Sequence, residues 1–135
     1  MKPVLTLTLT AAIALSAPAA FAKPHLRDVA KIDNSLMYLG IADELRKSCD
    51  NIGARMMRAL GYVNSLKSEA RKLGYTKDEI EDYVTSKAEK KRMRAKATQY
   101  LKSKGVQPGD KAAFCAYGRQ QITQKTTIGS LLKAK

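Results

Sequence analysis

The 135-residue sequence contains little of what metal sites and nucleophilic active sites are built from. It has no tryptophan, two cysteines and one histidine, His25, which follows Pro24 near the N-terminus and which we expect to be a solvated tail residue. A Ser-His or Cys-His nucleophile needs an imidazole that is held in place, and zinc takes several histidine or cysteine ligands. We therefore expect no metal and no cofactor.

Carboxylate pairs are a catalytic arrangement that the composition leaves open, because glycoside hydrolysis needs only two acids. The candidates are Asp43-Glu44 and the acids within residues 78–82. The second group lies in the first turns of an expected helix, where acids complement the helix dipole. Gly-rich phosphate loops and calcium loops are absent from the sequence. We assign no catalytic residue and expect a protein that is not an enzyme.

Residues 1–22, MKPVLTLTLTAAIALSAPAAFA, have the pattern of a secretory signal peptide. Lys2 supplies the positive charge, residues 4–17 are mostly apolar, and Ala20-Phe21-Ala22 is a cleavage site of the A-x-A type. The apolar run is too short to cross a bilayer, which needs about 20 apolar residues. We expect export to the periplasm, with release outside the cell as the alternative, and a processed domain over residues 23–135 without a transmembrane segment.

Both cysteines, Cys49 and Cys115, lie in the processed chain. In an oxidising compartment they have a single possible pairing. The bond would close a loop of roughly 65 residues, worth on the order of 4 kcal/mol in the chain-entropy model. Two buried free thiols are the alternative and suit a cytoplasmic protein better. Without a C-x-x-C motif a redox role has little support, so we predict a structural disulfide.

Helix-forming residues dominate the chain, and no proline occurs between Pro24 and Pro108. This composition predicts an all-α fold, a small bundle of about five helices without a sheet, stapled by the disulfide. One unbroken helix over 35–73 would be about 58 Å long, too long for this domain. We therefore place a break at residues 49–53 and expect a helical hairpin with matching apolar seams.

Local signals predict where the helices begin and end. The first helix is expected after Asp33-Asn34-Ser35, each of which can cap it, and residues 23–33 are expected to be flexible. Gly74 and Gly105 are stop signals for helices. Thr76–Glu79 and Ser86–Glu89 have the capping-box pattern at the start of a helix. Asp110 is expected to cap a later helix, and three apolar residues near the C-terminus suit docking on the core. These three apolar residues are Ile128, Leu131 and Leu132.

Positive charge is concentrated in the C-terminal half. Residues 23–84 carry 11 basic and 10 acidic side chains, whereas residues 85–135 carry 13 basic and 2 acidic ones. The densest stretch is SKAEKKRMRAKATQYLKSKG, residues 86–105. As a helix it would turn one apolar face inward and spread its charges over the remaining arc of about 200°. The inner face is Met93, Ala97, Tyr100 and Leu101; the candidate anion-binding residues are Lys87, Lys90, Lys91, Arg92, Arg94, Lys96, Lys102 and Lys104.

Two interpretations of this basic helix stay open. Long basic side chains favour helices and extend over apolar surface, so the charges can be a solvated exterior. Alternatively they capture an anionic partner, such as lipid head groups or lipopolysaccharide phosphates. Nucleic acid is disfavoured, because no Phe or Trp interleaves the charges as single-strand binders prefer and because export conflicts with a cytoplasmic DNA-binding role.

Four stretches spread over most of the processed chain resemble an uncharacterised family of small exported helical proteins from alphaproteobacteria. They are IADELRKSCDNI (41–52), LGYTKDEIEDYV (73–84), FCAYGRQQI (114–122) and IGSLL (128–132). The resemblance implies a helical, two-cysteine, exported protein and no catalytic residues. The segment after residue 85 is more basic than this family's pattern, which weakens any family-wide role for the polycation.

The function that we expect is therefore a non-enzymatic interaction or structural module of the cell envelope, whose partner is another envelope protein. The alternative is a binder of anionic surfaces or polymers through the basic helix over residues 87–104.

Overall fold

The computed structural model describes residues 22–135 of the chain, so the predicted signal peptide lies outside the described residues except for Ala22. The described residues form six α-helices, a short 3-10 helix and two short strands. In chain order these are η1 (Leu26–Asp28), α1 (Ala30–Ser48), β1 (Ile52–Ala54), α2 (Met56–Lys72), α3 (Lys77–Thr85), α4 (Lys87–Ser103), α5 (Lys111–Gln124), α6 (Thr127–Ser130) and β2 (Leu132–Ala134). The predicted helical class is confirmed.

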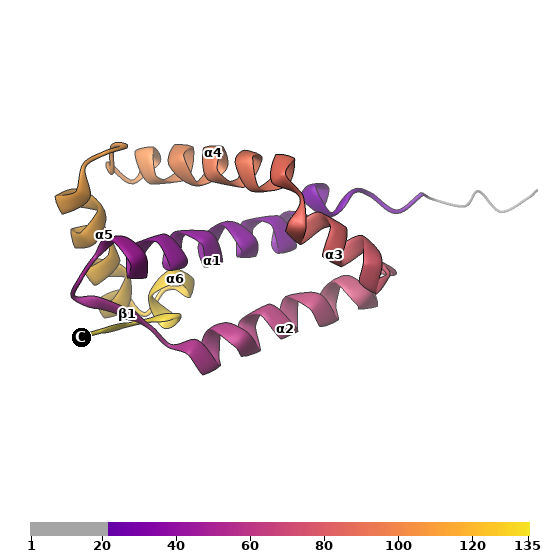
Figure 1. Ribbon diagram of the computed structural model, residues 1–135, viewed down its shortest axis with the longest axis horizontal. Coiled ribbons are helices and arrows are strands. Elements are labelled where there is room, and N and C mark those ends of the chain that lie inside the picture. The colour runs from indigo at the N-terminus through magenta and orange to yellow at the C-terminus, as the bar shows by residue number, and fades with distance from the viewer. Residues whose placement is uncertain (1–21) are drawn as a thin grey trace, which may run out of the picture.

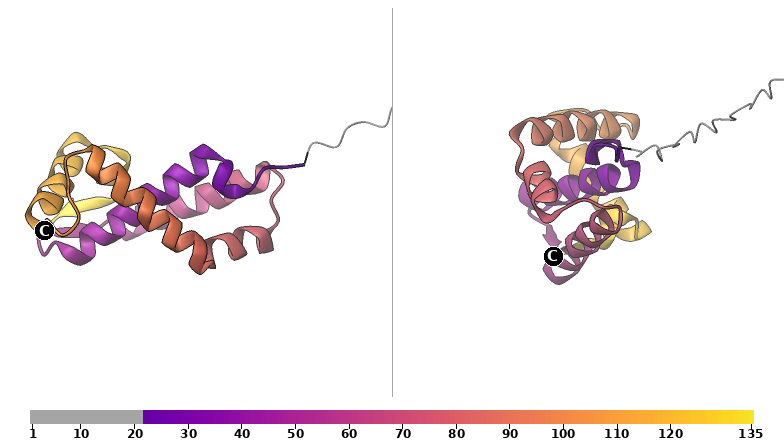
Figure 2. Two further views of the ribbon diagram at one scale, coloured as in Figure 1. Left: turned by 90° about the horizontal axis from the view of Figure 1, so that it is seen from above. Right: turned by 90° about the vertical axis from the view of Figure 1, so that its right-hand side faces the viewer.

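Helix α1 is the central element of the bundle. Helix α4 runs along one side of it and α2 along the other, while α3 joins these two at the end where α1 begins (Figures 1 and 2). Helices α5 and α6 pack at the end of α1 that carries Cys49. This central place requires apolar residues on more than one side of α1, and Ile32, Met37, Ile41 and Leu45 are all buried.

The apolar interior has two parts. The larger one gathers the second half of α1, α5, α6 and both strands around Leu45, Ile52 and Leu131, which are at most 2% exposed. The smaller one lies where α3 meets the start of α1 and contains Leu26, Ile32, Ala70, Tyr75 and Ile80.

A small two-stranded sheet contradicts the prediction that the fold has none. Strand β1 follows the predicted break after α1 and pairs antiparallel with β2, with Ile52 opposite Ala134 and Ala54 opposite Leu132. The Arg55 side chain donates to the Leu132 carbonyl at 2.8 Å and extends the contact. Strands this short carry no alternating pattern, and their pairing depends on the C-terminal tail folding back.

The start of α1 was also predicted wrongly. The helix begins at Ala30, before the polar residues that were expected to cap it, and the residue that precedes it is the apolar Val29. Tertiary contacts replace the missing cap: Leu26 and Ile32 enter the smaller core, and the Tyr75 hydroxyl donates to the Pro24 carbonyl. The segment 23–33, expected to be flexible, is thus in contact with the folded body.

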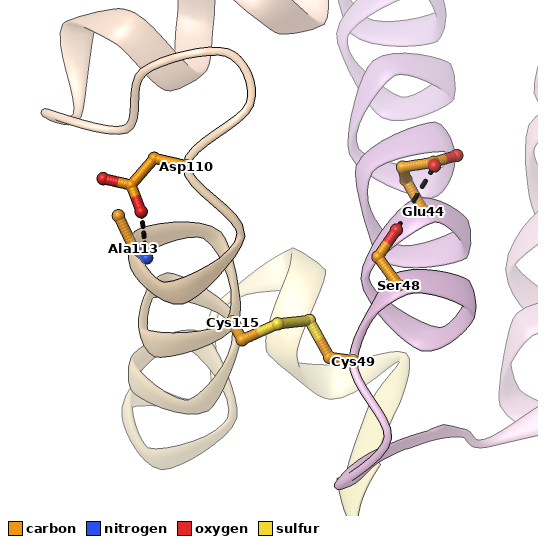
Figure 3. Close-up of a disulfide and its surroundings, with 6 residues drawn as sticks. All are labelled: Glu44, Ser48, Cys49, Asp110, Ala113 and Cys115. Carbon is orange, nitrogen blue, oxygen red and sulfur yellow. Dashed lines mark hydrogen bonds between the residues drawn. A yellow bond between two sulfur atoms is a disulfide. The ribbon is translucent and has the colours of Figure 1, made fainter.

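Most of the predicted helix ends are confirmed in detail. Gly74 and Gly105 adopt φ values of +93° and +81°. The N–H groups of the following residues reach back to close Schellman motifs, Tyr75 to Ala70 at 3.2 Å and Val106 to Leu101 at 2.9 Å. The capping box at the start of α3 is complete, and the Asp110 carboxylate accepts from the N–H of Ala113 at 3.0 Å (Figure 3).

The second predicted capping box, at the start of α4, forms only by half. Ser86 accepts a hydrogen bond from the Glu89 N–H at 3.2 Å, so a new helix does begin at this point. The Glu89 carboxylate does not return to Ser86, because Arg27 and Arg92 bind it instead.

The C-terminal tail docks on the core as predicted. Ile128, Leu131 and Leu132 are at most 2% exposed. Gly129 lets α6 approach α5 closely, because a Cβ at this position would lie 1.8 Å from the Gln121 carbonyl oxygen.

Candidate functional site

The predicted inner face of the basic helix is confirmed. Met93, Ala97, Tyr100 and Leu101 are partly buried against the larger core. Six of the eight candidate anion-binding residues are exposed, and none of the six forms an ion pair with another part of residues 22–135. They are Lys87, Lys90, Lys91, Arg94, Lys102 and Lys104.

The other two candidates, Arg92 and Lys96, turn toward α1 and bind the carboxylate of Asp33. Asp33 is 3% exposed and also accepts a hydrogen bond from the Tyr83 hydroxyl at 2.9 Å. The Arg92 Nε donates to Glu89 at 2.7 Å, and Glu89 in turn binds Arg27. The Lys96 ammonium also donates to the Asn34 side-chain oxygen at 2.6 Å, and we call these seven residues the Asp33 cluster.

The electrostatics of the Asp33 cluster favour the charged forms. Burial alone would raise the pKa of Asp33, but the hydrogen bonds from Arg92, Lys96 and Tyr83 lower it from 3.8 to about 2. Burial and the nearby Asp33 carboxylate raise the pKa of the Tyr83 hydroxyl, so that it stays protonated as a donor. The cluster joins η1, α1, α3 and α4 and has a structural role, which removes Arg92 and Lys96 from the outer basic surface.

Sequence reasoning missed the Asp33 cluster, since it treated Asp33 as a capping residue. One local signal was available: Glu89 and Arg92 are spaced i, i+3, which allows a pair on one helix face. The long-range partner Asp33 left no signal in the sequence.

Three of the six acidic residues that were considered as catalytic pairs lie in structural contacts, whereas Asp78, Glu81 and Asp82 are exposed. Asp43 accepts from Arg46 at 2.8 Å and also binds Lys47, while Glu44 accepts from the Ser48 hydroxyl at 3.4 Å (Figure 3). Glu79 belongs to the capping box of α3. Within residues 22–135 no group of three or more His, Cys, Asp and Glu side chains is placed to hold a metal ion.

The predicted disulfide between Cys49 and Cys115 is confirmed (Figure 3). It ties Cys49, the C-cap residue of α1, to the second turn of α5. Because Cys49 is 1% exposed and belongs to the larger core, the bond cross-links α1 and α5 within that core.

An exposed apolar patch occupies the first turns of α2. We define the α2 patch as Met56, Met57 and Leu60, whose exposed fractions are 58%, 82% and 55%. Further along α2, Leu66 and Ala70 are buried. The first turns of α2 thus leave Met56, Met57 and Leu60 in contact with solvent, while Tyr62 is partly buried against the larger core and the second half of the helix is covered.

The surroundings of the α2 patch carry positive charge. Between Asp50 and Glu69 the chain has no acidic residue, while Arg55, Arg58 and Lys67 lie in this interval. Arg58 is exposed, whereas Arg55 is held by the Leu132 carbonyl.

No helix among residues 22–135 is both long enough and apolar enough to cross a bilayer.

Comparison with known proteins places this chain in a family. A family model described as "Family of unknown function (DUF5333)" matches residues 24–133. Neither the comparison with curated proteins nor the comparison with solved structures found a match. The resemblance to an uncharacterised family is thereby confirmed, while its alphaproteobacterial range and the export of this chain remain predictions.

Proposed function

We propose that this chain, which belongs to the DUF5333 family of unknown function, is a non-enzymatic interaction module of the cell envelope that docks another protein on the α2 patch. The exposure of Met56, Met57 and Leu60 on one helix is the observation that carries the proposal. Contiguous apolar surface that is rimmed by polar residues is typical of a protein interaction site.

The residue types of the patch suit such a contact. Methionine is flexible and polarisable and adapts to an uneven partner surface. Met57 is the most exposed of the three, at 82%. The buried second half of α2 holds the helix in place, so the patch is presented on a fixed support.

The charge around the patch supports a partner with an apolar centre and an acidic rim. Arg58 lies within the patch's own turns of helix, and no acidic residue occurs between Asp50 and Glu69. A second copy of this chain is disfavoured, because a two-fold contact would bring the same positive rim of both copies together.

Two observations support an envelope location. The N-terminal sequence has the pattern of a secretory signal, and a disulfide is typical of an oxidising compartment. The absence of enzymatic activity is supported by the structural contacts that occupy Asp43, Glu44 and Glu79.

Site-specific photo-crosslinking in intact cells tests the proposal. A photoreactive amino acid replaces Met57, and in a matched control it replaces Leu73, which is 49% exposed near the other end of α2 and about 24 Å away along the helix. We expect one discrete protein adduct from position 57 and none of that mass from position 73. The partner, once identified and purified, should bind the wild type, and Arg58→Glu should weaken binding by about tenfold through charge repulsion.

Three outcomes contradict the proposal. An adduct of twice the chain mass assigns the patch to a second copy. Adducts with lipid alone assign it to a membrane surface. Equal adducts from positions 57 and 73 show that contact with α2 is non-specific.

A second candidate function is supported by the six exposed basic residues of α4 and its C-cap, which form no ion pair within residues 22–135 and which we call the α4 surface. They would capture anionic surfaces or polymers, such as lipid head groups or lipopolysaccharide phosphates, by long-range attraction. Helices α4 and α2 lie on opposite sides of α1 (Figure 1), so the two candidates use separate faces.

Vesicle sedimentation distinguishes this candidate. Binding to phosphatidylglycerol vesicles should be strong at low ionic strength and weak at physiological ionic strength, where charges are screened beyond about 8 Å. Reversal of Lys91, Arg94 and Lys102 to Glu should abolish binding. Reversal of the exposed Arg71, Lys72 and Lys77, outside α4, should reduce it far less. Absence of binding at low ionic strength refutes the candidate.

A further inference from the structure

A cavity of about 440 Å³ opens between α1, the end of α4, α5 and the start of α6. This volume lies in the range of small-molecule sites, roughly 300–1,000 Å³. Its walls include Tyr38, Tyr100, Tyr117, Lys104, Gln120 and Gln124. The α2 patch is on another helix, and of the six exposed basic residues considered above Lys104 alone belongs to the cavity lining.

The lining groups are mostly hydrogen-bonding groups, and the charged one among them is positive. Tyrosine hydroxyls, glutamine amides and threonine hydroxyls line the walls together with Lys104, and no acidic side chain does. The rings of Tyr38 and Tyr100 meet edge to face at 5.6 Å. The Lys104 Nζ lies 5.4 Å from the centre of the Tyr100 ring, which places the ammonium at this wall.

Tyr117 is an independent indication of a ligand. Its side chain lines the cavity and the residue is 6% exposed, yet its buried hydroxyl has no hydrogen-bond partner among the described residues. Buried polar groups in folded proteins are nearly always paired. The hydroxyl is closed to solvent, so a ligand oxygen would pair it after a small shift of the surrounding rings and would offset the cost of leaving it unpaired.

The protonation state of these tyrosines fits a donor role. Burial raises the pKa of Tyr117, with a further contribution from the neighbouring Tyr100. Burial and the neighbouring Tyr100 and Tyr62 also raise the pKa of Tyr38. Both hydroxyls therefore stay neutral and can donate to an oxygen at any physiological pH.

We propose that this cavity binds a small hydroxylated molecule with one anionic group, a sugar acid or a sugar phosphate, whose charge contacts Lys104 and whose hydroxyls contact the tyrosine and glutamine side chains. One ammonium group matches one anionic group. The tyrosine and amide groups match an oxygen-rich ring, since they both donate and accept hydrogen bonds.

Other classes of small molecule fit the lining less well. A free amino acid carries an ammonium group, which no carboxylate in the lining would neutralise. A polyphosphate would need several cationic groups, and Lys104 is the charged residue of the lining. A purely apolar ligand would leave the hydroxyls and amides unpaired at a cost for each group.

A two-dimensional ¹H–¹⁵N NMR titration of the exported, disulfide-bonded protein tests this inference. The probes are sodium glucuronate and glucose 6-phosphate, with glucose and inorganic phosphate as the neutral and ring-free comparisons. We expect saturable shifts at Tyr117, Gln120 and Thr127, with a Kd below about 1 mM for at least one anionic sugar. The amides of α3, at the other end of the bundle, should not shift.

Three variants identify the contacts. Lys104→Gln should raise the Kd about tenfold, because a charge-assisted hydrogen bond is lost. The matched control Lys102→Gln removes an exposed α4 lysine outside the lining and should leave the Kd unchanged. Tyr117→Phe should raise the Kd severalfold, because it removes a buried hydroxyl at the inner wall of the cavity.

Each remaining outcome overturns the inference. Absence of saturable shifts with both anionic sugars means that the cavity holds only water. Equal affinity for glucose removes the role of the charge, and equal affinity for inorganic phosphate removes the role of the sugar ring. Equal effects of Lys104→Gln and Lys102→Gln assign the binding to the general basic surface and not to the cavity. None of these outcomes bears on the α2 patch, which is tested separately.

Discussion

Asp33 should account for a defined part of the acid sensitivity of this protein. Its carboxylate is 3% exposed and is bound by Arg92 and Lys96. The pKa of this carboxyl falls from 3.8 to about 2 in the folded state, because the hydrogen bonds outweigh the effect of burial. In the unfolded chain these contacts are lost and the pKa returns to its ordinary value.

The sign of the effect follows from this lowered pKa. The stabilisation is fully present above pH 3.8, and it is lost as the pH falls from there through about 2, where the folded carboxyl also takes up a proton. One pKa unit corresponds to 1.36 kcal/mol, so the pair of values gives about 2.5 kcal/mol in the free energy of unfolding.

Replacement of Asp33 by Asn tests the same quantity at pH 7. The free energy of unfolding should fall by about 2–3 kcal/mol, which is less than the full cost of removing one partner of a buried ion pair. Arg92 and Lys96 are 31% and 32% exposed, and they keep contacts to Glu89 and to Asn34 at 2.7 and 2.6 Å. Solvent and these partners therefore stabilise the positive charges of Arg92 and Lys96 in the variant.

Urea unfolding, followed by circular dichroism with the disulfide intact, measures the free energy of unfolding of the wild type and of Asp33→Asn between pH 7 and pH 2. We expect the difference between wild type and Asp33→Asn to shrink as the pH falls below 4. The control Asp82→Asn changes an exposed acid that forms no ion pair within residues 22–135, and its effect should stay within about 0.5 kcal/mol. A difference that is independent of pH, or smaller than about 0.5 kcal/mol at pH 7, refutes the reasoning.

Three further changes have expected effects on unfolding by urea. Replacement of Cys49 and Cys115 by Ala removes the disulfide and should cost about 4 kcal/mol by the chain-entropy model; a loss below about 1 kcal/mol contradicts it. Lys125→Gly removes the strain of a non-glycine residue at φ +54° and should raise the free energy of unfolding by about 0.5–1 kcal/mol. A lower urea midpoint would contradict the claim that Lys125 is strained. Gly129→Ala drives a Cβ toward the Gln121 carbonyl and should cost about 3 kcal/mol, whereas wild-type stability would show that α6 is free to shift.

Helix ends were the part of the fold that could be predicted best. Gly74 and Gly105 end α2 and α4 through bonds that close within a few residues. Thr76 and Asp110 begin α3 and α5 through bonds to the N–H group three residues on. Each of these hydrogen bonds joins residues that are at most five apart in the chain, so the residue types alone predict where the helix ends.

Contacts between distant segments were the part that could not be predicted. β1 and β2 pair across most of the chain, and α1 begins at Ala30 because tertiary burial substitutes for a cap. For the candidate sites, the outer six basic residues followed from the helical pattern, while the inward turn of Arg92 and Lys96 did not, because it depends on where Asp33 lies.

The amino-acid sequence by itself determined the helical class, the positions of the breaks, the single possible disulfide and the basic character of α4, since each depends on composition or on neighbours within a turn. Tertiary structure alone decided that Asp33 is buried among cations, that Met57 stays exposed while Ala70 is covered, and that Tyr38, Tyr100 and Tyr117 line one cavity. The physical reason is that burial and charge pairing depend on which distant segments pack together, and packing involves the whole chain at once.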